Sequence, residues 1–219
     1  MDLIKRAADA ILHMDRHLGD WVEKFGPWAY ALLFLIIFCE TGLVVTPFLP
    51  GDSLLFAAGA LGASGALDAR VAAAVLITAA VVGNSVNYAV GRSVGARLIH
   101  LAQTDPRWRR WINPDYVTRA HAFFEKHGGK AIVLTRFMPI IRTFVPFVAG
   151  VAEMPPATFA FYNITGGVAW VAVCLGAGYL FGNVPVVKNN FSLVAIGIVL
   201  VSLLPMLVEF VRYRREPRT

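Results

Sequence analysis

Apolar residues in this chain fall in long blocks, without the alternating or helical patterning of a soluble core. Blocks of this kind are typical of helices that cross a membrane, each of which needs about 20 mainly apolar residues. The composition agrees, because 57% of the 219 residues are hydrophobic, 16% are charged and the mean hydropathy is +0.62. The pattern therefore predicts an all-α polytopic membrane protein that forms a single membrane domain over residues 1–219.

The blocks and the charges between them predict segments of three kinds: amphipathic or basic surface segments, plain spanning helices, and apolar stretches interrupted by proline and charge. In chain order these are an amphipathic N-terminal helix (1–24), a first interrupted stretch (27–67), a spanning helix (71–91), a basic amphipathic connector (92–130), a second interrupted stretch (131–156), two further spanning helices (161–182 and 191–211) and a basic tail (212–219).

The first interrupted stretch holds two acids inside an apolar run. Glu40 and Asp52 are the only ionisable carboxylates or bases between residues 26 and 67, and helix breaks are expected at Pro47, Pro50 and Gly51. An acid at hydrocarbon depth costs about 2.5–3.5 kcal/mol on insertion scales, so each acid needs a partner or a wet cavity. The stretch reads either as a discontinuous, re-entrant hairpin or as two ordinary spanning helices joined by a tight turn outside the membrane.

The distribution of basic residues predicts the topology. Residues 92–130 hold eight bases against three acids, and residues 209–219 hold four against two, whereas residues 1–24 hold four against five. Because Lys and Arg near membrane segments are retained in the cytoplasm, the connector and the C-terminus are both expected there. The N-terminal charge is too balanced to assign a side.

This topology decides the path of the second interrupted stretch. Arg136 and Arg142 lie in it, and breaks are expected at Pro139 and Pro146. The two later spanning helices already connect one cytoplasmic segment to the other, so the stretch must make no net crossing. It is therefore predicted to be a re-entrant hairpin that enters and leaves on the cytoplasmic side.

The two halves of the chain also share short motifs. Phe-Ala-Ala-Gly at 56–59 matches Phe-Val-Ala-Gly at 147–150, and Tyr-x-x-Gly at 88–91 matches Tyr-x-x-Gly at 179–182, both 91 positions apart. The helices that carry the second motif run in opposite directions in the predicted topology. Together these features predict an inverted repeat with two opposed hairpins, each followed by a transmembrane helix.

Opposed hairpins would bring the two acids toward the two arginines near the middle of the bilayer. A guanidinium binds phosphate through two parallel hydrogen bonds, so Arg136 and Arg142 are candidate ligands of an anionic lipid headgroup. Glu40 and Asp52 would then titrate, and competition for arginine would couple proton binding to substrate binding. The alternative is a pair of salt bridges that only holds the hairpins together.

At these residues the chain resembles the bacterial DedA family of membrane proteins. The resemblance covers nearly the whole chain and rests on Glu-Thr-Gly at 40–42, Phe-Leu-Pro-Gly-Asp-Ser at 48–53, Asn-Tyr-x-x-Gly-Arg at 87–92, Phe-Glu-Lys-His-Gly-Gly-Lys at 124–130, Arg-Phe-x-Pro-x-x-Arg-Thr at 136–143, Ala-Gly at 149–150, and Asn-x-x-Gly-x-x-x-Trp at 163–170.

The resemblance implies the opposed re-entrant hairpins of the VTT domain. It also implies that the chain moves undecaprenyl phosphate or a related lipid across the bacterial inner membrane, in a role linked to the proton motive force and to envelope integrity. On this basis Glu40 and Asp52 would couple protons, and Arg136 and Arg142 would bind the phosphate. Some relatives are expected to carry an acid at the position of Asn84, so a third carboxylate role is absent here.

Other function classes are weighed against a lipid flippase or scramblase. A proton-coupled ion antiporter or small-oxyanion permease would use the same acids, and a structural membrane factor would need only the salt bridges. An enzyme is not expected, because no catalytic triad, metal-ligand cluster or phosphate loop is present in the sequence, and no metal, cofactor or nucleic-acid partner is implied. The expected partners are a membrane lipid and protons, and the sequence leaves open whether the protein forms a homodimer.

Overall fold

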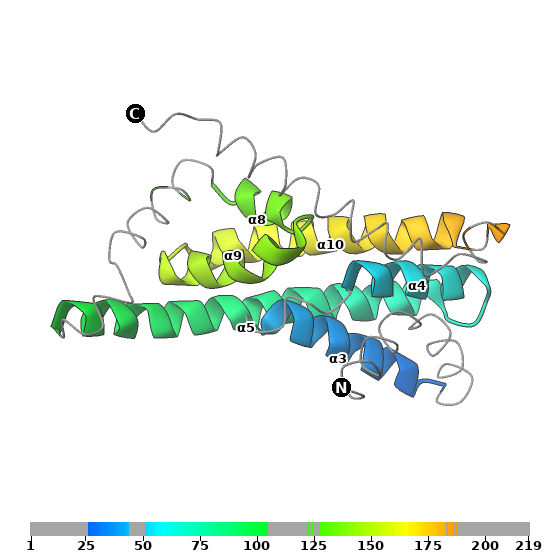
Figure 1. Ribbon diagram of the computed structural model, residues 1–219, viewed down its shortest axis with the longest axis horizontal. Coiled ribbons are helices and arrows are strands. Elements are labelled where there is room, and N and C mark those ends of the chain that lie inside the picture. Colours follow the sequence, from blue (N-terminus) through cyan, green and yellow to red (C-terminus); the bar gives the residue numbers. More distant parts are fainter. Residues whose placement is uncertain are drawn as a thin grey trace, which may run out of the picture. The chain divides into compact units, whose positions relative to one another are not determined.

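The computed structural model describes residues 26–43, 51–104, 122, 124, 128–182, 184, 185 and 187, and the side chains of residues 96–104, 139 and 140 are not among those described. The regular structure in this part of the chain is helical (Figure 1): α3 (Trp28–Gly42), α4 (Gly51–Ala63), α5 (Ala69–Thr104), α8 (Lys130–Thr135), α9 (Pro139–Val151) and α10 (Pro156–Phe181). The predicted N-terminal helix, Pro47, Pro50, most of the connector, the helix at 191–211 and the tail lie outside the described residues.

Two of these helices are long and apolar enough to cross a membrane. They cover Ala69–Gly95 and Pro156–Phe181, with 27 and 26 residues, and each contains an 18-residue window with a mean hydropathy of 1.7. Their outward faces carry large apolar side chains, including Val86 on α5 and Phe161 on α10. An apolar exposed face suits a lipid environment, and the prediction of an all-α membrane protein is confirmed.

Helix α5 does not end at Gly91, where the sequence predicts the end of a spanning helix. It continues to Thr104 and has 36 residues. A Cβ added to Gly91 would overlap the carbonyl oxygen of Phe147, and one added to Gly95 would lie 2.9 Å from the Cα atom of Val151. These glycines therefore allow a close approach of α9 within a continuous helix, which is why the prediction of a helix end here is wrong.

The second interrupted stretch contains one clear break. Helix α8 has six residues and ends before Arg136, and Met138 is extended, with φ −116° and ψ 100°, just before Pro139 begins α9. Proline disfavours the helical conformation in the residue before it, so the break falls where Pro139 predicts it.

Pro146, by contrast, does not break the helix. It lies inside α9, which continues to Val151, so the prediction of a break at this residue is wrong. Proline costs α9 one backbone hydrogen bond, but close packing of the following turn against α5 at Gly150 keeps that part of the helix in place.

The first interrupted stretch also contains two short helices. Helices α3 and α4 have 15 and 13 residues, each fewer than the roughly 20 needed for one full span. Gly51 is the first residue of α4, and the connection before it, residues 44–50, lies outside the described part of the chain.

The chain divides into two compact units. The first unit takes its residues from Met1–Ile36, Leu49–Leu76 and Trp170–Thr219, and the second from Ile37–Phe48 and Ile77–Ala169. The boundary falls inside α3, α5 and α10, so each of these helices contributes residues to both units.

In each unit a short helix packs closely on a long one through glycine. In the first unit, a Cβ on Gly59 of α4 would overlap the carbonyl oxygen of Leu175, and one on Gly178 of α10 would overlap that of Phe56. In the second unit, Gly150 of α9 meets the carbonyl oxygen of Tyr88 in the same way, and Gly91 of α5 meets that of Phe147. Backbones approach this closely only where a side chain is missing.

The two sets of contacts share one sequence relation. The α4 residues Phe56 and Gly59 correspond to the α9 residues Phe147 and Gly150, which lie 91 positions later. The long helices do not follow the same relation. Gly91 of α5 meets the carbonyl oxygen of Phe147, and the α10 residue that meets the equivalent oxygen of Phe56 is Gly178. The Tyr-x-x-Gly match would instead pair Gly91 with Gly182, which lies one helical turn later.

The glycine contacts generate a prediction about stability. Gly59→Ala would force its Cβ into the backbone of α10 and should lower the free energy of unfolding by about 1–3 kcal/mol, the usual cost of overpacking. Gly176→Ala on α10 is the matched control, because its added Cβ would have no atom within 4 Å. Denaturant unfolding of the detergent-solubilised protein measures both, and equal stability of the two variants would contradict the close contact.

Candidate functional site: a buried polar core

Buried polar side chains are concentrated in the second unit. Of the nine buried polar or charged residues in the described part of the chain, eight belong to this unit, and we call these eight the polar core: Glu40, Thr41, Asn84, Asn87, Arg136, Arg142, Thr143 and Asn163. The ninth, Asp52, belongs to the first unit. Burying so many polar groups is costly unless each finds hydrogen bonds or an opposite charge, so their arrangement calls for a physical reason.

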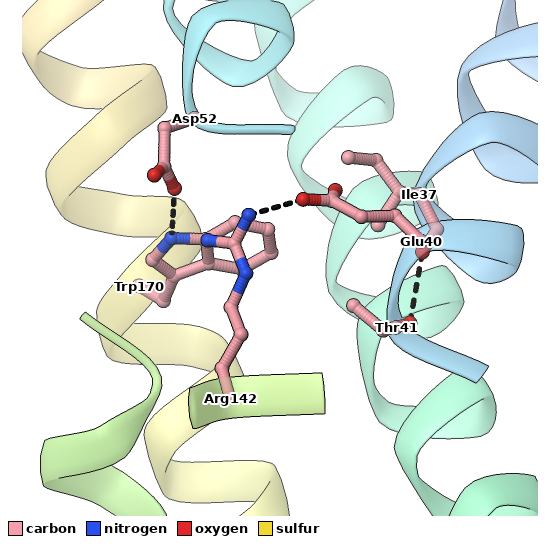
Figure 2. Close-up of polar contacts among 6 residues, drawn as sticks. All are labelled: Ile37, Glu40, Thr41, Asp52, Arg142 and Trp170. Carbon is pink, nitrogen blue, oxygen red and sulfur yellow. Dashed lines mark hydrogen bonds and ion pairs between the residues drawn. The ribbon is translucent and has the colours of Figure 1, made fainter. Parts of the chain in front are cut away.

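Glu40 and Arg142, two members of the polar core, form a buried ion pair (Figure 2). Glu40 lies near the C-terminal end of α3 and is 0% exposed, and Arg142 lies near the start of α9 and is 5% exposed. The guanidinium Nη2 of Arg142 donates to Oε1 of Glu40. The pair joins the two interrupted stretches, as the sequence predicts for one acid and one arginine.

The hydroxyl of the neighbouring Thr41 forms a hydrogen bond within its own helix. Its Oγ1 donates to the carbonyl oxygen of Ile37, 2.8 Å away, as Figure 2 shows. This bond keeps the hydroxyl within α3, whereas the carboxylate of Glu40 accepts from Arg142 on α9.

Arg136, at the break between α8 and α9, points to helices α5 and α10. Its Nη2 donates to Oδ1 of Asn163 at 2.7 Å and to the carbonyl oxygen of Ala80 at 3.2 Å, with a longer contact of 3.4 Å to the carbonyl oxygen of Asn163. The Arg136 side chain lies against Gly166 and Gly167, where an added Cβ would stand 3.4 Å from its Cδ and its Nη2, respectively. The side chain therefore packs directly on this part of α10.

Two asparagines of α5 connect the end of α3 to the rest of the core. Asn87 donates from Nδ2 to the carbonyl oxygens of Thr143 at 2.7 Å and Thr41 at 3.3 Å. Asn84, with its amide oriented to satisfy both of its ends, donates to the same Thr41 carbonyl at 3.3 Å and accepts from Arg136 at 3.0 Å. The last carbonyls of a helix lack intrahelical partners, so these amides cap α3 where water is excluded.

Asp52 belongs to the first unit. It stands in the first turn of α4, and its Oδ1 accepts a hydrogen bond of 2.8 Å from the indole Nε1 of Trp170 on α10 (Figure 2). Trp170 is 1% exposed. Within the first unit this hydrogen bond therefore joins the start of α4 to α10.

The structure thus brings together some of the predicted site residues and adds others. Glu40 and Arg142 are paired, Arg136 belongs to the same unit, and Asp52 belongs to the other. The partners Asn163, Asn87 and Trp170 carry no assigned role in the sequence analysis, although each stands in a motif shared with the DedA family. Amide side chains inside apolar helices are the signal that points to the first two, since such groups hydrogen-bond across helices.

Chemically, the polar core offers two guanidinium groups and one carboxylate in a space shielded from water. A guanidinium suits carboxylate and phosphate oxygens, and its attraction to an anion is strong where water is excluded. Among the described residues, no group of three or more His, Cys, Asp and Glu side chains is arranged to hold a metal ion. The arrangement favours the recognition of an anion.

Comparison with known proteins places the chain among bacterial membrane proteins. The VTT domain matches residues 49–180. Protein DedA of Escherichia coli is 48% identical over 98% of this chain and 97% of its own length, and an uncharacterized membrane protein of Mycobacterium tuberculosis is 44% identical over 90% and 87%. Inner membrane protein YqjA of E. coli is 38% identical over 72% and 69%. No solved structure matches the chain.

The ion pair predicts that substitutions of Glu40 and Arg142 affect stability in a coupled way and not independently. Glu40→Gln removes the counter-charge of Arg142, and Arg142→Met removes that of Glu40, so each should lower the free energy of unfolding by about 3–5 kcal/mol. The double variant should cost much less than the sum of the two, because no charge of the pair then remains buried. Denaturant unfolding in detergent measures the cycle, and strictly additive losses would contradict a direct pair.

Proposed function

Since this chain belongs to the VTT-domain family, with E. coli DedA among its relatives, we propose that it is a proton-coupled lipid transporter. Its substrate would be undecaprenyl phosphate or a related phospholipid, moved across the bacterial inner membrane in support of envelope integrity. The observation that carries this proposal is the polar core, in which two buried arginines and a buried acid lie among apolar helices.

The arginines would bind the phosphate headgroup. Arg142 is paired with Glu40 in the structure, and a phosphate that approached Arg142 would compete with this carboxylate for the same guanidinium. A lipid phosphate has a charged headgroup attached to an apolar chain. A polar core inside apolar helices can bind the headgroup while the chain stays among the membrane lipids. The exposed apolar faces of α5 and α10 support this arrangement.

The acids would couple transport to protons. When phosphate displaces Glu40 from Arg142, a buried carboxylate loses its counter-charge, and a proton can take that place. Phosphate binding and proton binding would then occur together, which is the coupling that a proton-driven transporter needs. Asp52, held by Trp170, would be the second proton-handling group.

We include two opposed re-entrant hairpins and an inverted repeat in this proposal. Support comes from the short helices α3, α4, α8 and α9, and from the break at Arg136–Met138. Further support comes from the matching glycine contacts of Gly59 and Gly150 inside the two units. The basic residues at 209–219 support a cytoplasmic C-terminus, and the inner-membrane name of YqjA supports the location.

Transport in proteoliposomes tests the proposal. Wild-type protein should translocate undecaprenyl phosphate faster with a pH gradient than without one. Arg136→Ala and Arg142→Ala should each slow translocation by about 10- to 100-fold, since a hydrogen bond to a charged group contributes about 1.5–3 kcal/mol. Glu40→Gln should remove the dependence on the gradient, because the amide cannot take up the coupled proton.

Arg70→Gln is the control for the loss of a positive charge, since Arg70 is exposed at the start of α5. It should transport as the wild type does. Unchanged translocation by folded Arg136→Ala and Arg142→Ala proteins would contradict the proposal. Proton-coupled ion flux in liposomes without the lipid would favour an ion antiporter or small-oxyanion permease.

A further inference from the structure

The carboxamide of Asn163 has a fixed direction in the polar core. It stands on α10 and is fully buried, and its Nδ2 donates to the carbonyl oxygen of Val81 at 3.0 Å and to Oγ of Ser85 at 3.1 Å. An amide nitrogen has two hydrogens, and α5 accepts both. The oxygen of the amide is therefore the end that faces Arg136.

The hydrogen bonds described above for Arg136 are donated by one nitrogen, Nη2. Nη2 donates to Oδ1 of Asn163 at 2.7 Å, to the carbonyl oxygen of Ala80 at 3.2 Å and, in the orientation assigned above, to Oδ1 of Asn84 at 3.0 Å. Nη2 carries two hydrogens, so these acceptors, with the longer contact to the carbonyl oxygen of Asn163, use both of them. The shortest of these bonds is the one to Oδ1 of Asn163.

This use of Nη2 affects how Arg136 can bind phosphate. A guanidinium has two edges with parallel N–H groups, one formed by Nε and Nη2 and the other by Nη1 and Nη2. Both edges contain an Nη2 hydrogen. Arg136 can therefore form the two parallel bonds to a phosphate only after Nη2 leaves at least one of its present acceptors.

We propose that Asn163, which accepts the shortest of these bonds, is a positioning residue that holds Arg136 in a resting orientation, and that a lipid phosphate replaces its Oδ1 at Nη2 when it binds. The inference rests on the proposed function, because it assumes that Arg136 takes the phosphate. A phosphate oxygen is anionic and bonds a guanidinium more strongly than a neutral amide oxygen does, so the exchange is favourable. A carboxylate at the same place would hold Nη2 too firmly to be exchanged.

Two substitutions at residue 163 separate this role from simple structural support. Asn163→Asp keeps the size of the side chain but adds a charge facing Arg136, and should raise the apparent KM for undecaprenyl phosphate at least tenfold. Asn163→Ser has a side chain too short to span the same contact, and should lower the apparent KM about threefold. Loss of mere structural support would instead raise KM in both variants, and either that result or an unchanged KM would overturn the proposal.

A chemical readout tests the resting orientation without transport. Phenylglyoxal modifies arginine side chains, and peptide mass spectrometry of the full-length protein in detergent follows Arg136 and Arg142 separately. Asn163→Ser should speed the modification of Arg136 at least threefold and Asn163→Asp should slow it, while Arg142 serves as the internal reference. Thr165→Val is the matched control on α10, since its Oγ1 donates within its own helix to Phe161. An Arg136 rate that is the same in all variants would overturn the proposal.

The experiments distinguish a failure of the positioning role of Asn163 from a failure of the proposed lipid-transport function. If Asn163 controls the rate of Arg136 modification but undecaprenyl phosphate neither protects Arg136 nor is transported by the wild type, the positioning role stands and the lipid substrate is wrong. If inorganic phosphate protects Arg136 as well as the lipid does, the site recognises free phosphate. If undecaprenyl phosphate is transported but the Asn163 variants match the wild type in KM and in modification rate, only the positioning role is wrong.

Discussion

The ion pair between Glu40 and Arg142 is the interaction on which the rest of the second unit depends. Each charge taken out of water costs several kcal/mol, and the pair regains this only through close contact. The contact requires α3 to end, and α9 to begin, where their two side chains can meet. The break before Pro139 and the glycine contacts of α9 with α5 are the features that place Arg142 for this purpose.

Around the pair, the fold uses amides and backbone carbonyls in place of water. Asn87 and Asn84 cap the end of α3, and Asn163 and Ala80 accept from Arg136. Neutral acceptors satisfy a buried guanidinium without cancelling its charge, so the arrangement keeps its attraction for an anion. A core built only for stability would be served as well by apolar side chains, which is why the polar core favours a role in binding.

The sequence was sufficient to predict the parts of this arrangement that depend on strong local rules. The long apolar blocks predict α5 and α10, and Pro139 predicts the break before α9. Isolated charges in apolar stretches predict that the two acids approach the two arginines, and the structure shows one such contact, between Glu40 and Arg142. The helix end predicted at Gly91 and the helix break predicted at Pro146 were wrong, because each residue is tolerated inside a helix where tertiary packing compensates. Asn163 and Trp170 could not be assigned, since only the fold shows that they face Arg136 and Asp52.

A structure of the protein in lipid nanodiscs with undecaprenyl phosphate, determined by electron cryomicroscopy, tests the central claim most directly. The claim is that the polar core binds a lipid phosphate through its arginines. We expect the phosphate within hydrogen-bonding distance of Arg136 and Arg142, with Glu40 released from Arg142 and Oδ1 of Asn163 replaced at Nη2. A phosphate bound elsewhere, with the Glu40–Arg142 and Arg136–Asn163 contacts unchanged, would contradict the claim.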